Sequence, residues 1–468
     1  MTVATTRDLH RGMKVLGALI LTLSAATPAS SIFVIVPDVL SAAGTGALIA
    51  MGLAALIAIC VAQVYAELGS AFPLAGGEYA MVGRILGPWA GFAVLGLNLV
   101  NSLLATAVLA LGVSPYLAAA GFAEPQNALA LMVVAGATLL SILNIRTNAL
   151  VTGLFVAVEL ASLVVLAILG AAHPERSLTG MLAHPAIYSG ATPTAATPAM
   201  IGLGVAAAIF AYDGYGSAVY FGEELHQARK GIGRAIVWAL AITVAAEVIP
   251  LAAVLSGAPD LKALLGSGAG LVDFLGVRGG PLLKRVISLG IALAIVNAVI
   301  AMVLLTARQL FATGRDEAWP GPVNGALARV HPRLRSPWVA TLAAGGLASG
   351  LCLVNQTLLI VATGTGAAVI YGALCVAVLA GRRSGATDHG HHRMPLYPWV
   401  PIATLSALCG VLYADWLDPD IGRPGLFIAL GVAAASALYY AVAVRGRGRW
   451  TLRGPQDGVE DQSSDGSS

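Results

Sequence analysis

Three carboxylates lie inside long apolar stretches of this 468-residue chain: Glu159, Asp213 and Glu247. A carboxylate in surroundings of low dielectric is costly unless it is paired or hydrated, so it usually faces a cavity, where it can pair with an amine or carry a proton. Each also has a purely structural explanation. Asp213 could cap a helix that begins at Gly214, and either glutamate could be a permanently protonated acid bonded to a neighbouring helix. Capping and binding by Asp213 are compatible.

Two segments are poor helix centres, and Asp213 lies in the second. The first reads Ala26-Thr27-Pro28-Ala29-Ser30-Ser31, and the second reads Ala211-Tyr212-Asp213-Gly214-Tyr215-Gly216-Ser217. Proline removes a backbone donor and clashes with the preceding turn, while paired glycines loosen a helix, so freed backbone groups must line a protected cavity. Such cavities bind solutes. The alternative is an ordinary kink at Pro28 and close packing at Gly214 and Gly216.

The elements that position these residues are membrane helices. Hydrophobic residues make up 58% of the chain and charged residues only 10%. Continuous apolar runs without period-two alternation exclude a β-barrel, so we predict an all-α membrane protein with about twelve transmembrane helices. The predicted spans are 15–41, 45–68, 86–117, 128–146, 149–172, 198–224, 232–257, 282–313, 338–355, 357–381, 397–417 and 424–444.

An even number of spans places both termini on one side of the membrane. Basic residues such as Arg11, Lys14, Arg229 and Arg382 gather on that side, so the positive-inside rule makes it the cytoplasm and the membrane the inner one. Residues 1–14 are then a cytoplasmic N-terminus and 445–468 a cytoplasmic disordered tail. The lipid bilayer and a small-molecule substrate are the predicted partners. Nucleic-acid binding is excluded because the basic residues follow topology and form no patch.

The two breaks are about 185 residues apart, each in the first helix of a five-helix block. The first block covers 15–172 and the second 198–381. An odd number of helices inverts the second block relative to the first, which predicts two inverted repeats, helices 1–5 and 6–10, with broken helices 1 and 6. Residues 397–444 supply two extra helices.

Several motifs resemble the amino acid-polyamine-organocation transporter superfamily. The clearest runs from Tyr65 to Tyr79, with the core Phe72-Pro73-Leu74-Ala75-Gly76-Gly77-Glu78-Tyr79, and continues in Leu86-Gly87-Pro88-Trp89-Ala90-Gly91-Phe92. Two others are Thr306-Ala307-Arg308-Gln309-Leu310-Phe311 and Arg393-Met394-Pro395-Leu396-Tyr397-Pro398-Trp399. The resemblance implies two inverted five-helix repeats plus two helices and transport of amino acids or related amines.

By this resemblance, the substrate lies between the breaks. The residues implied are Thr27, Pro28, Ala29, Ser30 and Ser31 in the first break and Phe210, Ala211, Tyr212, Asp213 and Gly214 in the second. The family usually has Gly-Ser-Gly-Ile-Phe where this chain has Ala-Ser-Ser-Ile-Phe at 29–33. Without these glycines the backbone amides that hold a substrate carboxylate are freed less easily, which favours a substrate lacking that group.

Coupling is assigned to Glu159 or Asp213. Some proton-coupled relatives carry a lysine near the position of Glu159, and here the charge is reversed. We predict a proton-coupled secondary transporter that works by alternating access, with sodium coupling and uncoupled exchange as alternatives. A polyamine or amine importer or exchanger and a non-transporting receptor of the same fold are the other functions considered. No cofactor, metal or enzymatic activity is expected, because every histidine lies outside the spans and no H-E-x-x-H or G-x-S-x-G pattern occurs.

Other polar residues receive weaker assignments. Pathway walls or links between helices are the two uses expected for Asn98, Asn101, Asn297, Thr363 and Thr365. Solvated ends or inner-gate ion pairs with Arg84, Arg229 or Arg234 are expected at the cytoplasmic face for Glu67, Glu78, Glu223 and Glu224.

Overall fold

The computed structural model describes residues 13–122, 124–143, 145–188, 193–266, 270–354, 356–417, 419, 422–448 and 450–452. Most of the predicted cytoplasmic N-terminus and the predicted tail from residue 453 onward lie outside these residues. The described part is almost entirely helical, and its strands are two residues long each. The all-α prediction is therefore confirmed for this part of the chain.

The first half contains the first break and the helices that follow it. Its elements are α1 (Val15–Ala26), α2 (Pro28–Ser30), the π-helix η1 (Ser31–Ile35), α3 (Val36–Ala43), η2 (Gly44–Gly46), α4 (Ala47–Ala71), α5 (Glu78–Leu86), α6 (Pro88–Leu111), α7 (Ser114–Ala120), α8 (Gln126–Ser141), α9 (Ile145–Ala171), α10 (Leu178–Ala183), β1 (Ala186–Ile187) and β2 (Thr194–Ala195). β1 and β2 pair antiparallel.

The second half begins with the second break. Its elements are α11 (Pro198–Ala211), the 3-10 helix η3 (Tyr215–Phe221), α12 (Ala228–Gly257), α13 (Leu261–Gly266), α14 (Gly270–Arg315), α15 (Gly321–Leu327), α16 (Trp338–Leu351), α17 (Gln356–Ser384), α18 (Trp399–Leu417), α19 (Gly422–Tyr439), η4 (Tyr440–Val444) and η5 (Arg445–Arg447). The predicted span 282–313 is the longer part of α14, which bends at Gly280 just before Pro281.

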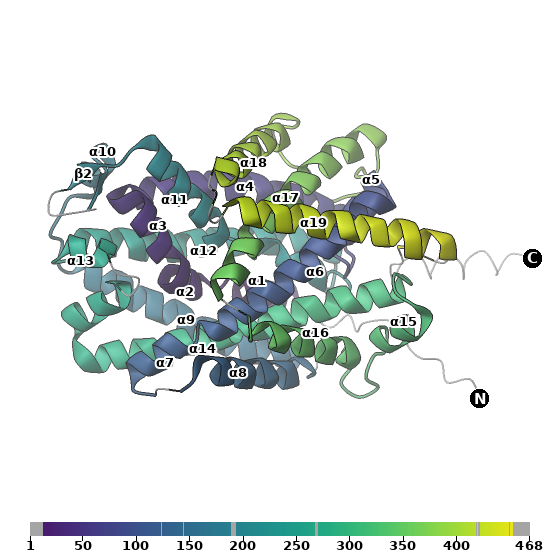
Figure 1. Cartoon of the computed structure of the whole chain (residues 1–468), viewed down its shortest axis with the longest axis horizontal. Helices are drawn as coiled ribbons and strands as arrows, with labels where there is room; N and C mark the ends of the chain where they lie inside the picture. The colour runs from purple at the N-terminus through teal and green to yellow at the C-terminus, as the bar shows by residue number, and fades with distance from the viewer. Residues whose placement is uncertain are drawn as a thin grey trace, which may run out of the picture.

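Most long helices run along the longest axis of the molecule (Figure 1). α10, β2 and α13 lie at one end, and α5 and α15 lie at the other. α12 packs against α4 and α9, while α14 packs against α6, α9 and α16. The backbones of α9 and α12 approach closely where Gly170 faces Ala253 and Gly257, as small residues allow in membrane helices.

Eight helical stretches in the described part are long and apolar enough to cross a membrane, and α8 and α16 are apolar but shorter. The surface agrees with a membrane location. Large apolar side chains such as Leu150, Leu282 and Val442 are three-quarters exposed, at 77%, 75% and 75%. An apolar surface of this kind is stable in lipid and not in water. The chain is therefore a multi-pass membrane protein.

Candidate functional site

A cavity of about 360 Å³ lies between the two broken helices. Three of the five residues predicted from the first break line it, namely Thr27, Ser30 and Ser31. The second break contributes Phe210, Asp213 and Gly214. The structure thus brings the two breaks together around one space, although 180 residues separate Ser31 from Ala211, whose carbonyl accepts a hydrogen bond of 2.8 Å from the Ser31 hydroxyl.

In the first break, the helix is interrupted at Thr27 and Pro28. Thr27 takes a left-handed conformation with φ of 43°, Pro28 starts a new helical turn, and the backbone then widens into the π-helix η1. A left-handed conformation is unusual for threonine, so the local structure must be held by its surroundings. The amide of Ala29 donates to Oε1 of Glu159 over 2.8 Å. The predicted loosening at Pro28 is present, but this amide already has a protein partner.

Gly214 fixes the approach of the second break to the first. α11 ends at Ala211, and Gly214 has a φ of 106°, a region that other residues rarely occupy. A Cβ atom at Gly214 would lie 2.6 Å from Cα of Ala26. The amide of Gly214 donates to Oδ1 of Asp213 over 2.7 Å, and Asp213 also lies in the cavity wall. Gly214 itself is the N-cap of η3, which has no side-chain cap.

Four predicted residues of the breaks do not line the cavity: Pro28, Ala29, Ala211 and Tyr212. Tyr212 is fully buried, and its hydroxyl donates to the carbonyl oxygen of Met51 on α4 over 3.2 Å. These four residues belong to the breaks but lie outside the cavity lining.

Glu159 and Glu247 lie outside the cavity lining, behind the first break. Both are fully buried. Oε2 of Glu159 and both carboxyl oxygens of Glu247 accept no hydrogen bond from the described residues. Glu247 lies within electrostatic range of Glu159 and close to Ser31. Two buried carboxyl groups therefore lie beside the first break, one on α9 and one on α12.

Glu78 was not predicted to belong to the site. The sequence placed it at the cytoplasmic face, whereas it lines the cavity. It accepts hydrogen bonds from the Tyr65 hydroxyl over 2.8 Å and from Nδ2 of Asn98 over 3.2 Å, and a third from the Tyr220 hydroxyl. Gly77 positions it, because its φ of 56° turns the chain where a Cβ atom would strike the Tyr220 ring at 2.4 Å.

Most of the polar residues expected to form the pathway wall do line the cavity. Asn98, Asn101, Thr363 and Thr365 line the cavity, whereas Asn297 is buried elsewhere. Tyr65 and Tyr371, which the sequence did not single out, also line it. The hydroxyl of Tyr371 donates to Oδ1 of Asp213.

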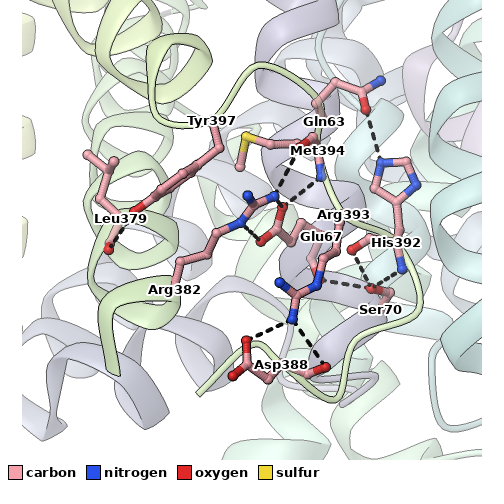
Figure 2. A network of polar contacts seen from close by, with 10 residues as sticks. All are labelled: Gln63, Glu67, Ser70, Leu379, Arg382, Asp388, His392, Arg393, Met394 and Tyr397. Atoms are coloured by element: carbon pink, nitrogen blue, oxygen red, sulfur yellow. Dashed lines mark hydrogen bonds and ion pairs between the residues drawn. The ribbon is translucent and has the colours of Figure 1, made fainter. Parts of the chain in front are cut away.

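The remaining three glutamates form ion pairs with other arginines than those predicted. Glu67 pairs with Arg382, Glu223 with Arg315 and Glu224 with Arg308, at 2.6, 2.6 and 3.0 Å. The expected partners were Arg84, Arg229 and Arg234. Figure 2 shows the first pair, where the Arg382 guanidinium lies between Glu67, the backbone of Met394 and the Tyr397 ring. These partners belong to α17 and α14, which the sequence alone does not bring to the carboxylates.

Comparison with known proteins agrees with this architecture. The family described as amino acid permease matches residues 13–440. An uncharacterized transporter from Mycobacterium tuberculosis is 29% identical over 350 residues, which are 74% of each chain. The branched-chain amino acid permease BcaP from Bacillus subtilis is 26% identical over 83% of this chain and 85% of its own. The serine/threonine exchanger SteT from the same species is 27% identical over 51% and 54%.

The match covers both breaks, the cavity between them and the ion pairs of Glu67, Glu223 and Glu224. The resemblance to amino acid transporters predicted from the motifs is confirmed, and the relatives are transporters and not enzymes. This multi-pass membrane chain therefore belongs to the amino acid permease family.

Proposed function

We propose that the protein is a secondary active transporter of amino acids or related organic amines in the inner membrane. The observation that carries this proposal is the cavity between the breaks, with Asp213 in its wall. In alternating access, a solute bound at this depth is exposed to either side as one bundle of helices rocks against the other. The proposed architecture has twelve transmembrane helices in two inverted repeats, 15–172 and 198–381, with two further helices in 397–444 and both termini in the cytoplasm.

The substrate is recognised through its amino group. The carboxylate of Asp213 is the anionic group that the second break presents to the cavity. BcaP and SteT are described as carriers of branched-chain amino acids and of serine and threonine, so neutral amino acids are the first candidates.

An amine without a carboxylate is the second candidate. The Ala29 amide, which a substrate carboxylate would need, is already bonded to Glu159. The cavity wall also contains Asp38 and Asp415 in addition to Asp213 and Glu78, and none of its described lining residues is a lysine or arginine. Such a wall attracts cations.

Proton symport is the proposed coupling, with Glu159 or Asp213 as the carrier. Glu159 is supported by its contact with the first break, since protonation would weaken its bond to Ala29 and so change the break. Sodium symport and uncoupled exchange are the alternatives.

The first test is a thermal-stability screen of detergent-purified protein with leucine, threonine and butane-1,4-diamine. A ligand at about 100 times its dissociation constant adds about 2.7 kcal/mol to the stability of the protein that binds it. Compounds that stabilise the protein are then tested for uptake into sealed proteoliposomes. Accumulation driven by a pH gradient supports symport, and binding without uptake would identify a receptor.

Glu159→Gln tests the carrier. If Glu159 carries the proton, the variant still exchanges substrate between the two sides but does not accumulate it under a pH gradient. Full accumulation by the variant would reject Glu159. Uptake that requires sodium and ignores the pH gradient would replace proton coupling by sodium coupling.

A further inference from the structure

Two carboxylates face the same cavity from different elements. Asp213 follows α11 and Glu78 begins α5, and both lie in the cavity wall. They are within electrostatic range of each other. Glu78 was expected at the cytoplasmic face, as a solvated end or in an ion pair with an arginine, so its pairing with Asp213 appears only in the folded protein.

The pair is joined through aromatic hydroxyl groups. Tyr65 donates to Glu78, and Tyr371 donates to Asp213. The two tyrosine rings pack edge to face with centroids 5.9 Å apart. The carboxylates therefore belong to one polar cluster, which connects α4, α5, α17 and the second break.

The two carboxylates differ in the hydrogen bonds they receive. Glu78 accepts three, on both of its oxygens, from Tyr65, Asn98 and Tyr220. Asp213 accepts bonds from Gly214 and Tyr371, both on Oδ1, so within the described chain Oδ2 has no partner. Neutral donors favour the ionised form of a carboxyl group. Glu78 is therefore the better anion, and Asp213 is the better place for a proton.

Two anions that face one cavity repel each other, and one positive charge relieves the repulsion. No lysine, arginine or histidine occurs among the described lining residues. The positive charge must come from a proton or from a cationic solute. Since both would use the same pair, each excludes the other.

We propose that Glu78 and Asp213 form one cation site that exchanges a shared proton for the ammonium group of the substrate. The inference rests on the proposed function, because it concerns the same cavity and a substrate with an amino group. When the ammonium group arrives, the O–H bond of Asp213 breaks, its electron pair stays on Oδ2, and the proton leaves to water. The charge of the site is conserved, because one monovalent cation replaces another.

This exchange is itself a form of coupling, because the empty pair returns a proton in the direction opposite to the substrate. A residue that loses its proton when substrate binds cannot carry a proton in the same direction as the substrate. Asp213 is then excluded as the symport carrier, and Glu159, which lies outside the cavity lining, is the group left for that role.

Other titratable groups surround the pair. The tyrosines that face it are Tyr65, Tyr215, Tyr220 and Tyr371, which stay neutral at physiological pH. Asp38 and Asp415 are the other acidic groups of the cavity wall. A test must separate these two from the proposed pair.

The experiment measures protons released when a ligand binds. Detergent-purified protein in weakly buffered solution with a pH indicator is mixed with leucine, threonine or butane-1,4-diamine. The wild type is expected to release about one proton for each ammonium group bound at the site, and its apparent affinity should weaken about tenfold per pH unit once the pair is protonated. Asp213→Asn and Glu78→Gln should abolish the release.

Two variants serve as matched controls. Asp38→Asn tests a different carboxyl group of the same wall, and loss of the release in this variant would assign the proton to another group and overturn the proposal. Glu78→Asp keeps a carboxylate and should restore release that Glu78→Gln loses, which distinguishes a charge requirement from misfolding. Binding by the wild type without proton release, or release by Glu78→Gln equal to that of the wild type, would overturn the proposal.

Infrared titration provides a readout that needs no ligand. The absorption of a protonated carboxyl group in the ligand-free protein should be lost in Asp213→Asn and altered in Glu78→Gln. A carboxyl spectrum that is identical in the wild type and in both variants would overturn the inference. If none of the three compounds stabilised the protein, the proposed substrates would fail, while the infrared result would still decide whether the pair holds a proton.

Discussion

At the scale of single residues, Glu67 and Arg382 form a bidentate ion pair (Figure 2). Nε and one terminal nitrogen of Arg382 each lie 2.6 Å from a Glu67 oxygen, and the Glu67 side chain is only 1% exposed. Removing one partner leaves a buried charge without compensation. We expect Arg382→Met to lower the free energy of unfolding by about 3–5 kcal/mol, measured by thermal denaturation in detergent.

The double variant Glu67→Met/Arg382→Met is the control for this prediction. It removes both charges and should recover most of the stability lost in the single variant, because no unpaired charge remains. Equal losses in the single and double variants would show that packing against Tyr397, and not the charge pair, stabilises this contact.

His392 makes the same region sensitive to pH. Burial lowers the pKa of its imidazole, while Glu67 opposes this shift and His391 adds to it. The ring nitrogen Nε2 lies 3.0 Å from Oε1 of Gln63. Since the folded protein resists protonation that the unfolded chain accepts below its ordinary pKa of about 6.5, stability should fall as the pH drops through that value.

Thermal unfolding of the wild type and His392→Gln between pH 8 and pH 5 measures this effect. The glutamine variant should lose less stability over the interval than the wild type, because it has no group to titrate at this position. Parallel pH profiles would assign the acid sensitivity to other residues.

At the scale of helices, the meeting of the two breaks depends on one glycine. A side chain at Gly214 would overlap the backbone of Ala26 and would also have to adopt a φ of 106°. Gly214→Ala should therefore lower stability by about 1–3 kcal/mol and abolish uptake, because the breaks would be pushed apart. Gly202→Ala in α11, the helix that precedes the second break, is the matched control and should retain both properties, because a Cβ atom there meets nothing within 4 Å.

Local chemistry explains which features of these helices were predictable. The breaks at Pro28 and Gly214 follow from backbone geometry, and the apolar stretches follow from their composition, so the sequence indicates both. Glu78 could not be placed because the turn at Gly77 and the ring of Tyr220 come from segments far apart. The arginine partners were missed for the same reason: which charges meet depends on how α14 and α17 pack.

At the scale of the molecule, the charges at the two ends differ. At the end of α13, Glu175 pairs with Arg278 and Asp273 with Lys284, so acidic and basic residues balance. At the end that contains α5 (Figure 1), the last turn of α17, which packs against α5, carries Arg382 and Arg383. The positive-inside rule predicts that this second end faces the cytoplasm, and the orientation stays a prediction.

The buried pairs of Glu223 and Glu224 tie the segment that follows η3 to α14. Glu223 also accepts a hydrogen bond of 3.0 Å from the amide of Ala75, in the turn between α4 and α5. Arg308 packs over the Phe221 ring as well as pairing with Glu224. These contacts connect the turn between α4 and α5, the segment after η3, and α14. Alternating access requires these contacts to be broken whenever the cavity opens past them.

Arg308→Gln should therefore favour the state that is open at the basic end. A cysteine at Ala105, which lines the cavity, reports access when Cys60 and Cys409 are replaced by alanine. In inside-out vesicles, we expect a membrane-impermeant maleimide to label this cysteine about tenfold faster in the variant, equivalent to a shift of about 1.4 kcal/mol. Adding Glu224→Gln should reduce the effect, because the unpaired carboxylate is then gone. Unchanged labelling in Arg308→Gln would mean that this pair stabilises the open and closed states equally and does not control access.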